Sequence, residues 1–241
     1  MIPLIAAFQF LTIFPAIIKR MFTSQEMGRA VAWYPLVGAV LGALLYGVNY
    51  FSRLIFPASI SAALTLIVWV MLTRAFHLDG FMDTCDGLFG GFTPERRLEI
   101  MKDSRMGAFG VAGGLLVLLT KYTALASSTV LLPALVISAT LSRWGMSLAI
   151  FAFPYAREHG LGRDVKDNVR WPQLILATCI ALIIVWLAGA QMGLVAFALA
   201  SLTLWLGVRY ILRLIPGLTG DSYGALCEGL ELIVLLFFAI Q

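Results

Sequence analysis

The chain has 241 residues, of which 61% are hydrophobic and 12% are charged, and its formal net charge is +4. A soluble domain contains about 45–50% apolar and about 25% charged residues, and a soluble fold of this size cannot bury so much apolar surface. The lysines and arginines are scattered rather than gathered in a stripe, so we expect no nucleic-acid partner. The apolar runs are long and continuous, which excludes a transmembrane barrel. The composition therefore predicts an all-α, polytopic helical bundle in a lipid bilayer.

The apolar runs divide the chain into segments long enough to cross a bilayer, which takes about 20 mostly apolar residues. The first stretch, 3–18, is short and contains Pro15, so we expect an interfacial or re-entrant segment there. About seven transmembrane helices follow, and counts of about six or eight stay open because segment ends are predicted only to within several residues. The predicted spans lie near residues 33–51, 58–76, 108–127, 134–153, 173–190, 192–210 and 225–240. We expect residues 1–241 to form a single integral membrane domain.

Basic residues indicate which side of the membrane each connection lies on, because cytoplasmic connections carry an excess of lysine and arginine. With a cytoplasmic N-terminus, the basic clusters between spans fall inside, and the outer connections hold only Arg53. We therefore expect a multi-pass protein of the cytoplasmic (inner) membrane. Within the spans, the pairs Gly38–Gly42 and Gly110–Gly114 have the spacing of closely packed helices in lipid.

A cluster of carboxylates follows the second predicted span. Asp79, Asp83 and Asp86 are spaced i, i+4, i+7, which places them on one face of a helix. Like charges beside apolar spans favour a neutralising partner, and Mg²⁺ binds one or two carboxylates together with substrate phosphates. The sequence thus predicts a magnesium site facing the cytoplasm, and a solvated acidic face is the alternative.

A second short helix is predicted to begin at Thr93, a helix cap followed by proline. Glu99 and Asp103 are expected to share one face of it, with Lys102 and Arg105 beside them. Carboxylates and cations together are the groups that phosphoryl transfer to an alcohol requires. The two basic residues can instead be ordinary anchors on the cytoplasmic side.

Two further cytoplasmic segments are candidates for the same site. One contains Arg157 and continues to Gly160-Leu161-Gly162, which suits a phosphate, although a plain connection is the alternative. The other contains Asp221, either a site residue or a helix cap. Glu228 follows inside an apolar helix, where a charged residue indicates function.

Three other charged or titratable side chains stand near or within the predicted spans. His77 borders the acidic face and is expected to orient a ligand. Lys121 and Arg143 lie within predicted spans, where they either pair with carboxylates or line a polar cavity.

At these motifs the chain resembles the cobalamin synthase family, the adenosylcobinamide-GDP ribazoletransferases, over nearly its whole length. The most specific of them are the acidic block and the segment Lys102-Asp103-Ser104-Arg105. The motifs that carry the resemblance are Phe10-Leu11-Thr12 with Phe14-Pro15, Tyr34-Pro35-Leu36-Val37-Gly38, His77-Leu78-Asp79-Gly80, Asp83-x-x-Asp86-Gly87, Glu99-Ile100-Met101-Lys102-Asp103-Ser104-Arg105-x-Gly107, Tyr155-Ala156-Arg157 with Gly160-Leu161-Gly162, and Leu218-Thr219-Gly220-Asp221 with Gly224-Ala225 and Glu228.

The resemblance implies a reaction that composition does not. Such enzymes join adenosylcobinamide-GDP to α-ribazole or its 5′-phosphate, with Mg²⁺, and release GMP in the late steps of cobalamin nucleotide-loop assembly. A homo-oligomer, or association with other enzymes of that pathway, stays open. The site residues carried over fall into three roles: metal ligands Asp79, Asp83, Asp86 and Glu99; catalytic residues Asp103 (proton acceptor or metal ligand), Lys102 and Arg105; and substrate-binding residues His77, Arg157, Asp221 and Glu228.

Other functions compete with this one. The acidic motif is also similar to that of the CDP-alcohol phosphotransferases of phospholipid synthesis, although glycines 90 and 91 stand where those enzymes carry Ala-Arg. A prenyltransferase would require two separated aspartate-rich motifs. A cation or corrinoid transporter would place its carboxylates near the membrane midplane, in repeated halves.

Overall fold

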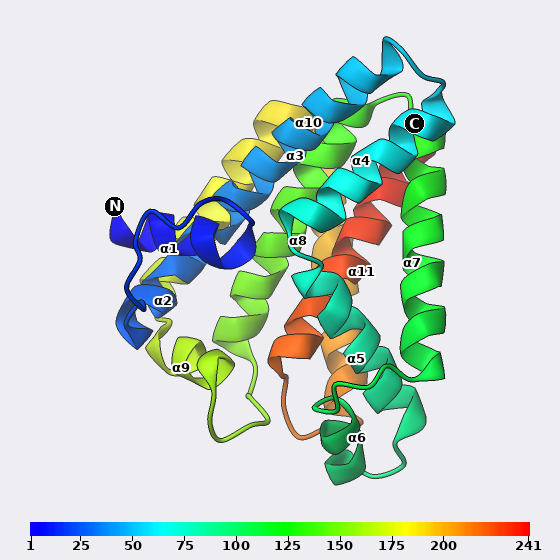
Figure 1. Cartoon of the computed structure of the whole chain (residues 1–241). Helices are drawn as coiled ribbons and strands as arrows, with labels where there is room; N and C mark the ends of the chain where they lie inside the picture. Colours follow the sequence, from blue (N-terminus) through cyan, green and yellow to red (C-terminus); the bar gives the residue numbers. More distant parts are fainter.

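The computed structural model describes all residues, 1–241, and is helical throughout (Figure 1). Connections without regular structure join the helices, and the only β-type pairing is an isolated bridge between Tyr155 and Leu218. The helices are α1 (Ile2–Leu11), α2 (Ser24–Ala30), the 3₁₀ turn η1 (Val31–Trp33), α3 (Tyr34–Arg53), α4 (Ala58–Leu72), α5 (Phe76–Gly90), α6 (Pro94–Ile100), α7 (Ala108–Ser127), α8 (Leu131–Ala152), α9 (Leu161–Asn168), α10 (Trp171–Leu212) and α11 (Gly220–Ala239).

Five helical segments are long and apolar enough to cross a membrane, and the bent pair α4–α5 can form a sixth. The 42 residues of α10 would extend about 63 Å as one straight helix, twice the roughly 30 Å of a bilayer core. Ala190 has non-helical backbone angles, and a Cβ on Gly193 would collide with the carbonyl oxygen of Val185. Since residues eight apart in a straight helix lie about 12 Å apart, α10 reverses direction at Ala190.

Contacts of α8 confirm this reversal. The Trp144 indole donates to Thr178 at 3.1 Å, and its ring lies 4.4 Å from that of Phe197. One side chain of α8 therefore contacts both halves of α10. Counting the halves separately gives the two spans that the sequence predicts there, near 173–190 and 192–210.

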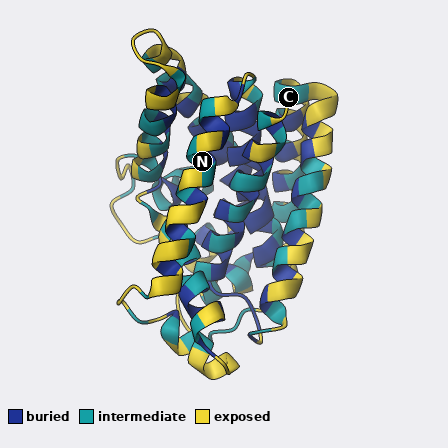
Figure 2. Ribbon diagram, turned by 90° about the vertical axis from the view of Figure 1, so that its right-hand side faces the viewer, coloured by how far each residue is buried: buried dark blue, intermediate teal, exposed yellow.

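The helix α8 lies at the centre of the bundle, and most of its residues are buried on every side. Exposed residues lie on the outer faces of the surrounding helices (Figure 2). The predicted glycine packing is confirmed. A Cβ on Gly42 would come within 2.5 Å of the Leu135 carbonyl oxygen, and one on Gly38 would collide with Ala139, so α3 crosses α8 in close contact.

Replacing Gly42 by alanine is expected to lower the free energy of unfolding by about 1–3 kcal/mol, because the added methyl group meets backbone that cannot give way. The matched control is Gly47→Ala on the same helix, since nothing lies within 4 Å of a Cβ there. Unfolding of both variants in detergent checks this, and equal stability of the two would contradict the close crossing.

The expectation of one span over 58–76 is wrong in one respect. The helix breaks after Leu72, and α4 and α5 meet at 88°. Arg74 and Ala75 make the turn with φ values of 54°, a left-handed conformation that is costly for residues other than glycine. The Arg74 guanidinium donates to the carbonyl oxygens of Gln9 and Phe10 at 3.2 and 2.9 Å. These bonds link the bend to the short helix α1, which lies in the stretch where the sequence predicts an interfacial or re-entrant segment.

The helices α6 and α9 and the connection before α11 gather at one end of the bundle (Figure 1). The backbone of Ala156 donates to the Leu218 carbonyl, and the backbone of Leu218 donates to Pro154, both at 2.8 Å. These bonds join the connection after α8 to the connection before α11. Three of the predicted site segments therefore meet at this end.

Candidate active site

The predicted acidic helix exists as α5, and its three aspartates differ in their surroundings. Asp79 is exposed and Asp83 is half-buried, and the carboxylate of neither has a hydrogen bond or an ion pair. The carboxylates of Asp79, Asp86 and Asp221 and the guanidinium of Arg157 all lie within electrostatic range of Asp83. The carboxylates of Asp79 and Asp83 therefore add negative charge to one face of α5 without a cation bound directly to either of them.

Glycines allow α5 and α11 to approach. A Cβ on Gly80 would lie 2.9 Å from the backbone oxygen of Asp221, and one on Gly224 would lie 2.9 Å from that of His77. The close crossing brings the first turn of α11, with Asp221, against the acidic face of α5.

Asp86 is buried and caps another helix. Its two carboxylate oxygens accept from the backbone amides of Gly107 and Gly110, each at 2.8 Å. Gly107 is the N-cap of α7, whose first turn otherwise has no side-chain cap. The residue predicted as a metal ligand thus satisfies two free amides at the positive end of α7.

Replacing Asp86 by asparagine is expected to lower stability by about 1–2 kcal/mol even in EDTA, because an NH₂ group would then face a backbone N–H. Asp83→Asn is the matched control, since the Asp83 side chain has no hydrogen-bond partner to lose. Heat unfolding in detergent with and without Mg²⁺ checks this. A loss of stability that appears only with Mg²⁺ would contradict the capping role.

Arg157 and Asp221 form an ion pair at 2.6 Å, so the two segments predicted as parts of the site meet. They line a cavity of about 280 Å³ together with Asp79. The start of α9 and the first turn of α11 both face it. The remaining lining residues are Phe10, Tyr34, Phe76, Gly80, Met146, Ile150, Tyr155, His159, Gly160, Leu161, Gly162, Val165, Gly220, Tyr223 and Gly224.

A second cavity, of about 320 Å³, lies beside the first and shares Arg157 and His159 with it. Lys102 lines this second cavity. The predicted cation after α6 therefore lies near Arg157, and both can contact one anionic ligand. His159 lines both cavities, although its place in a polar loop predicts only a solvated side chain.

The remaining residues after α6 are arranged differently from the prediction. Thr93 caps α6 as expected, but the helix ends at Ile100, so Asp103 does not continue its face. Glu99 is exposed and pairs with Arg96 at 2.7 Å. Arg105 pairs with Asp103 at 2.6 Å and lowers the pKa of that carboxyl to about 2. In this arrangement Asp103 is a weak base, because the paired guanidinium stabilises its ionised form.

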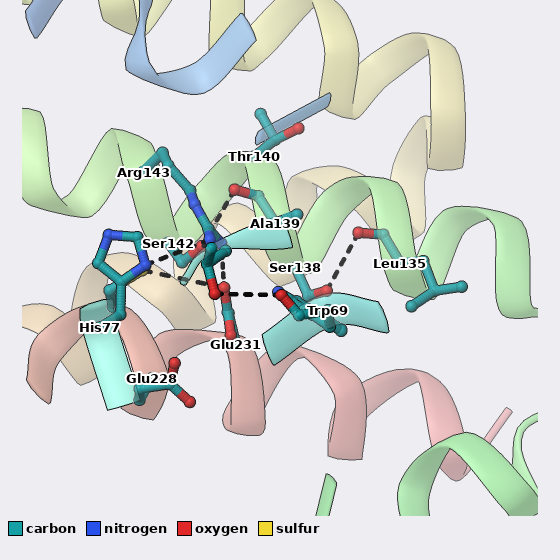
Figure 3. A network of polar contacts seen from close by, with 12 residues as sticks. Trp69, His77, Leu135, Ser138, Ala139, Thr140, Ser142, Arg143, Glu228 and Glu231 are labelled. Carbon is teal, nitrogen blue, oxygen red and sulfur yellow. Dashed lines mark hydrogen bonds and ion pairs between the residues drawn. The ribbon is translucent and has the colours of Figure 1, made fainter. Parts of the chain in front are cut away.

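His77 and Glu228, predicted to bind substrate, lie instead in a buried polar network (Figure 3). Lys121 pairs with Glu228 at 2.5 Å and also with Glu231, and Arg143 pairs with Glu231. The Arg143 guanidinium lies 3.4 Å from His77 Nδ1. The network joins α5, α7, α8 and α11. The sequence predicts that Lys121 and Arg143 either pair with carboxylates or line a polar cavity, and in the structure both pair with carboxylates.

The four residues predicted as metal ligands fit Mg²⁺ only in part. No three His, Cys, Asp or Glu side chains converge on one point that could hold a metal ion. Asp86 and Glu99 are engaged by backbone amides and by Arg96. Asp79 and Asp83 remain without partners, one helical turn apart, and Mg²⁺ needs only one or two carboxylates when substrate phosphates complete its shell. These two carboxylates therefore fit the ion.

Comparison with known proteins gives a consistent result over the full length. A model of the family described as Cobalamin-5-phosphate synthase matches residues 3–239. An adenosylcobinamide-GDP ribazoletransferase of Desulfitobacterium hafniense strain Y51 is 40% identical over 238 residues, which are 95% of this chain and 93% of the relative. One of Stutzerimonas stutzeri strain A1501 is 40% identical over 247 residues, 100% and 99% of the two chains. No solved structure matches. The chain therefore belongs to the cobalamin-5-phosphate synthase family, a family of transferases of cobalamin biosynthesis.

Proposed function

We propose that the chain transfers the phosphorylated adenosylcobinamide of adenosylcobinamide-GDP to α-ribazole or its 5′-phosphate and releases GMP. The names of its relatives support this substrate pair. The observation that carries the proposal is one cavity bordered by Asp79, by the pair of Arg157 and Asp221, and by the first turns of α9 and α11. A guanidinium and helix N-termini are suited to bind phosphate groups, and a carboxylate can help to hold the metal ion that phosphoryl transfer uses.

We assign Mg²⁺ to Asp79 and Asp83, where it would neutralise diphosphate oxygens when bound. Arg157 leaves its ion pair with Asp221 and binds a phosphate instead. Lys102 neutralises the phosphate of the departing GMP. Asp103 accepts the proton of the attacking hydroxyl once its pair with Arg105 has opened, since the paired carboxylate is a weak base. His77 acts by holding α5 against α8 through Arg143, and Glu228 acts by holding α11 against α7 through Lys121.

We also propose that this end of the bundle faces the cytoplasm and that the membrane is the inner one. Arg96, Arg97, Lys102 and Arg105 lie on and after α6, and Arg157 and Arg163 lie before and on α9. Arg53, at the end of α3, belongs to the opposite end (Figure 1). The excess of basic residues beside the site supports a cytoplasmic orientation.

A panel of donors tests the function. Purified protein in liposomes receives Mg²⁺, α-ribazole 5′-phosphate and one of three donors: adenosylcobinamide-GDP, CDP-diacylglycerol or an isoprenoid diphosphate. We expect nucleotide release only with the first donor, and its loss in EDTA. Release of CMP from the lipid donor, with no GMP from the corrinoid donor, would instead support a phospholipid-type phosphotransferase.

A further inference from the structure

We propose that the cavity of about 280 Å³ is the pocket of the acceptor nucleoside, with its flat base among aromatic side chains and its 5′-phosphate at the start of α9. This inference rests on the proposed function and extends it, because it assigns the acceptor and not the donor to this cavity. We attribute to this phosphate contact the preference for the phosphorylated acceptor, which the family description already implies through its product.

One part of the cavity lining is aromatic and aliphatic. Phe10, Tyr34 and Phe76 come from α1, α3 and α5. The Phe10 ring centroid lies 6.5 Å from that of Tyr34, with the rings at 25°, and 5.4 Å from that of Phe76. Met146 and Ile150 of α8 complete this apolar lining. Aromatic faces beside aliphatic side chains favour a flat heteroaromatic ring.

Another part of the lining is suited to a phosphate. Gly160 precedes α9 with a φ of 114°, and α9 has no side-chain cap. The backbone N–H groups of Leu161 and Gly162 have no hydrogen-bond partner, and both residues line the cavity. The positive end of α9 and the nearby Arg157 guanidinium would both stabilise a phosphate there.

A buried hydroxyl group gives an independent indication of a ligand. Tyr223 of α11 lines the cavity and is only 4% exposed, yet its hydroxyl has no hydrogen-bond partner. Its ring stacks on that of Tyr155 at 6.0 Å, which fixes its position. Leaving a buried hydroxyl unpaired costs about 1–3 kcal/mol. A polar atom of a bound nucleoside would pair with it.

The chemistry of the cavity favours the acceptor over the donor. Guanine carries hydrogen-bonding groups along its edges, and the apolar part of the lining, with its phenylalanine, methionine and isoleucine side chains, offers no partners for them. A corrinoid is far larger than about 280 Å³. Asp79 also borders the cavity, so an acceptor bound here has its ribose hydroxyls beside the acidic helix α5.

Tyr223→Phe tests the hydroxyl contact, because it keeps the aromatic ring and removes no hydrogen bond of the free protein. We expect KM for α-ribazole 5′-phosphate to rise about tenfold, the effect of one lost hydrogen bond, and KM for adenosylcobinamide-GDP to stay within twofold. The matched control is Tyr210→Phe, an exposed tyrosine outside the cavity, which should change neither constant. A rise in donor KM, or no change in acceptor KM, would overturn the assignment.

Leu161→Pro tests the phosphate contact. Proline is compatible with the first position of a helix but removes its N–H. Leu161→Ala keeps that N–H and is the control, since the Leu161 side chain is 51% exposed. We expect only the proline variant to lose, about tenfold, the preference in kcat/KM for α-ribazole 5′-phosphate over α-ribazole. An unchanged preference overturns this inference alone, whereas a wild-type chain that releases no GMP with either acceptor overturns the proposed function as well.

Discussion

Asp83→Asn is expected to lower kcat for GMP release at least about 100-fold, because it removes one of the two unpartnered carboxylates assigned to the metal. Stability should change little, since the Asp83 side chain has no hydrogen bond or ion pair in the structure. Single-turnover kinetics at saturating substrates measure the effect, and a binding assay for the donor separates affinity from catalysis.

The matched control for Asp83 is Glu95→Gln, which removes an exposed carboxylate from the first turn of the neighbouring helix α6. The control should retain nearly full activity, because Glu95 has no hydrogen bond or ion pair and does not border either cavity near Arg157. Equal losses in the two variants would indicate that total negative charge matters rather than the acidic face of α5. That result would contradict the assignment of the metal.

Glu231→Gln is expected to destabilise the bundle by about 3–5 kcal/mol, since it removes the carboxylate that Arg143 and Lys121 share. Arg143 is fully buried and would keep only Ser142, at 2.9 Å, and His77. An unpaired charge inside an apolar bundle is costly, whereas a balanced network is not. Unfolding in detergent by heat or by SDS titration measures the loss.

A double substitution shows whether Lys121 and Glu228 contribute to stability as a balanced pair of charges or only by packing. Lys121→Met and Glu228→Gln together remove one positive and one negative charge and leave the pair of Arg143 with Glu231. We expect the double variant to be more stable than the sum of the two single variants predicts. Strict additivity would show that the two side chains do not act as a pair.

Local sequence spacing predicted the helices well. The i, i+4, i+7 spacing of Asp79, Asp83 and Asp86 identified α5, and Thr93 identified the start of α6. The break between α4 and α5 could not be predicted in this way, because its left-handed residues are Arg74 and Ala75 rather than glycine. Its geometry depends on the contact of Arg74 with α1.

Long-range partners explain most of the remaining differences at the site. Asp86 accepts from amides 21 and 24 residues away, and Glu228 pairs with a lysine 107 residues away. Spacing along the chain carries no information about such partners. The sequence identified these residues as unusual in an apolar chain, but the folded bundle decides whether a carboxylate caps a helix, neutralises a cation or remains free.

The fate of the two phosphorus atoms of the donor shows whether the chain transfers phosphorylated adenosylcobinamide to the acceptor. Adenosylcobinamide-GDP labelled on the phosphorus next to cobinamide is incubated with the purified chain, Mg²⁺ and α-ribazole 5′-phosphate for one turnover. We expect that all the label enters the completed corrinoid, that unlabelled GMP appears in equal amount, and that neither forms without the acceptor. Label in GMP, or GMP release at the same rate without acceptor, would contradict the proposed transfer.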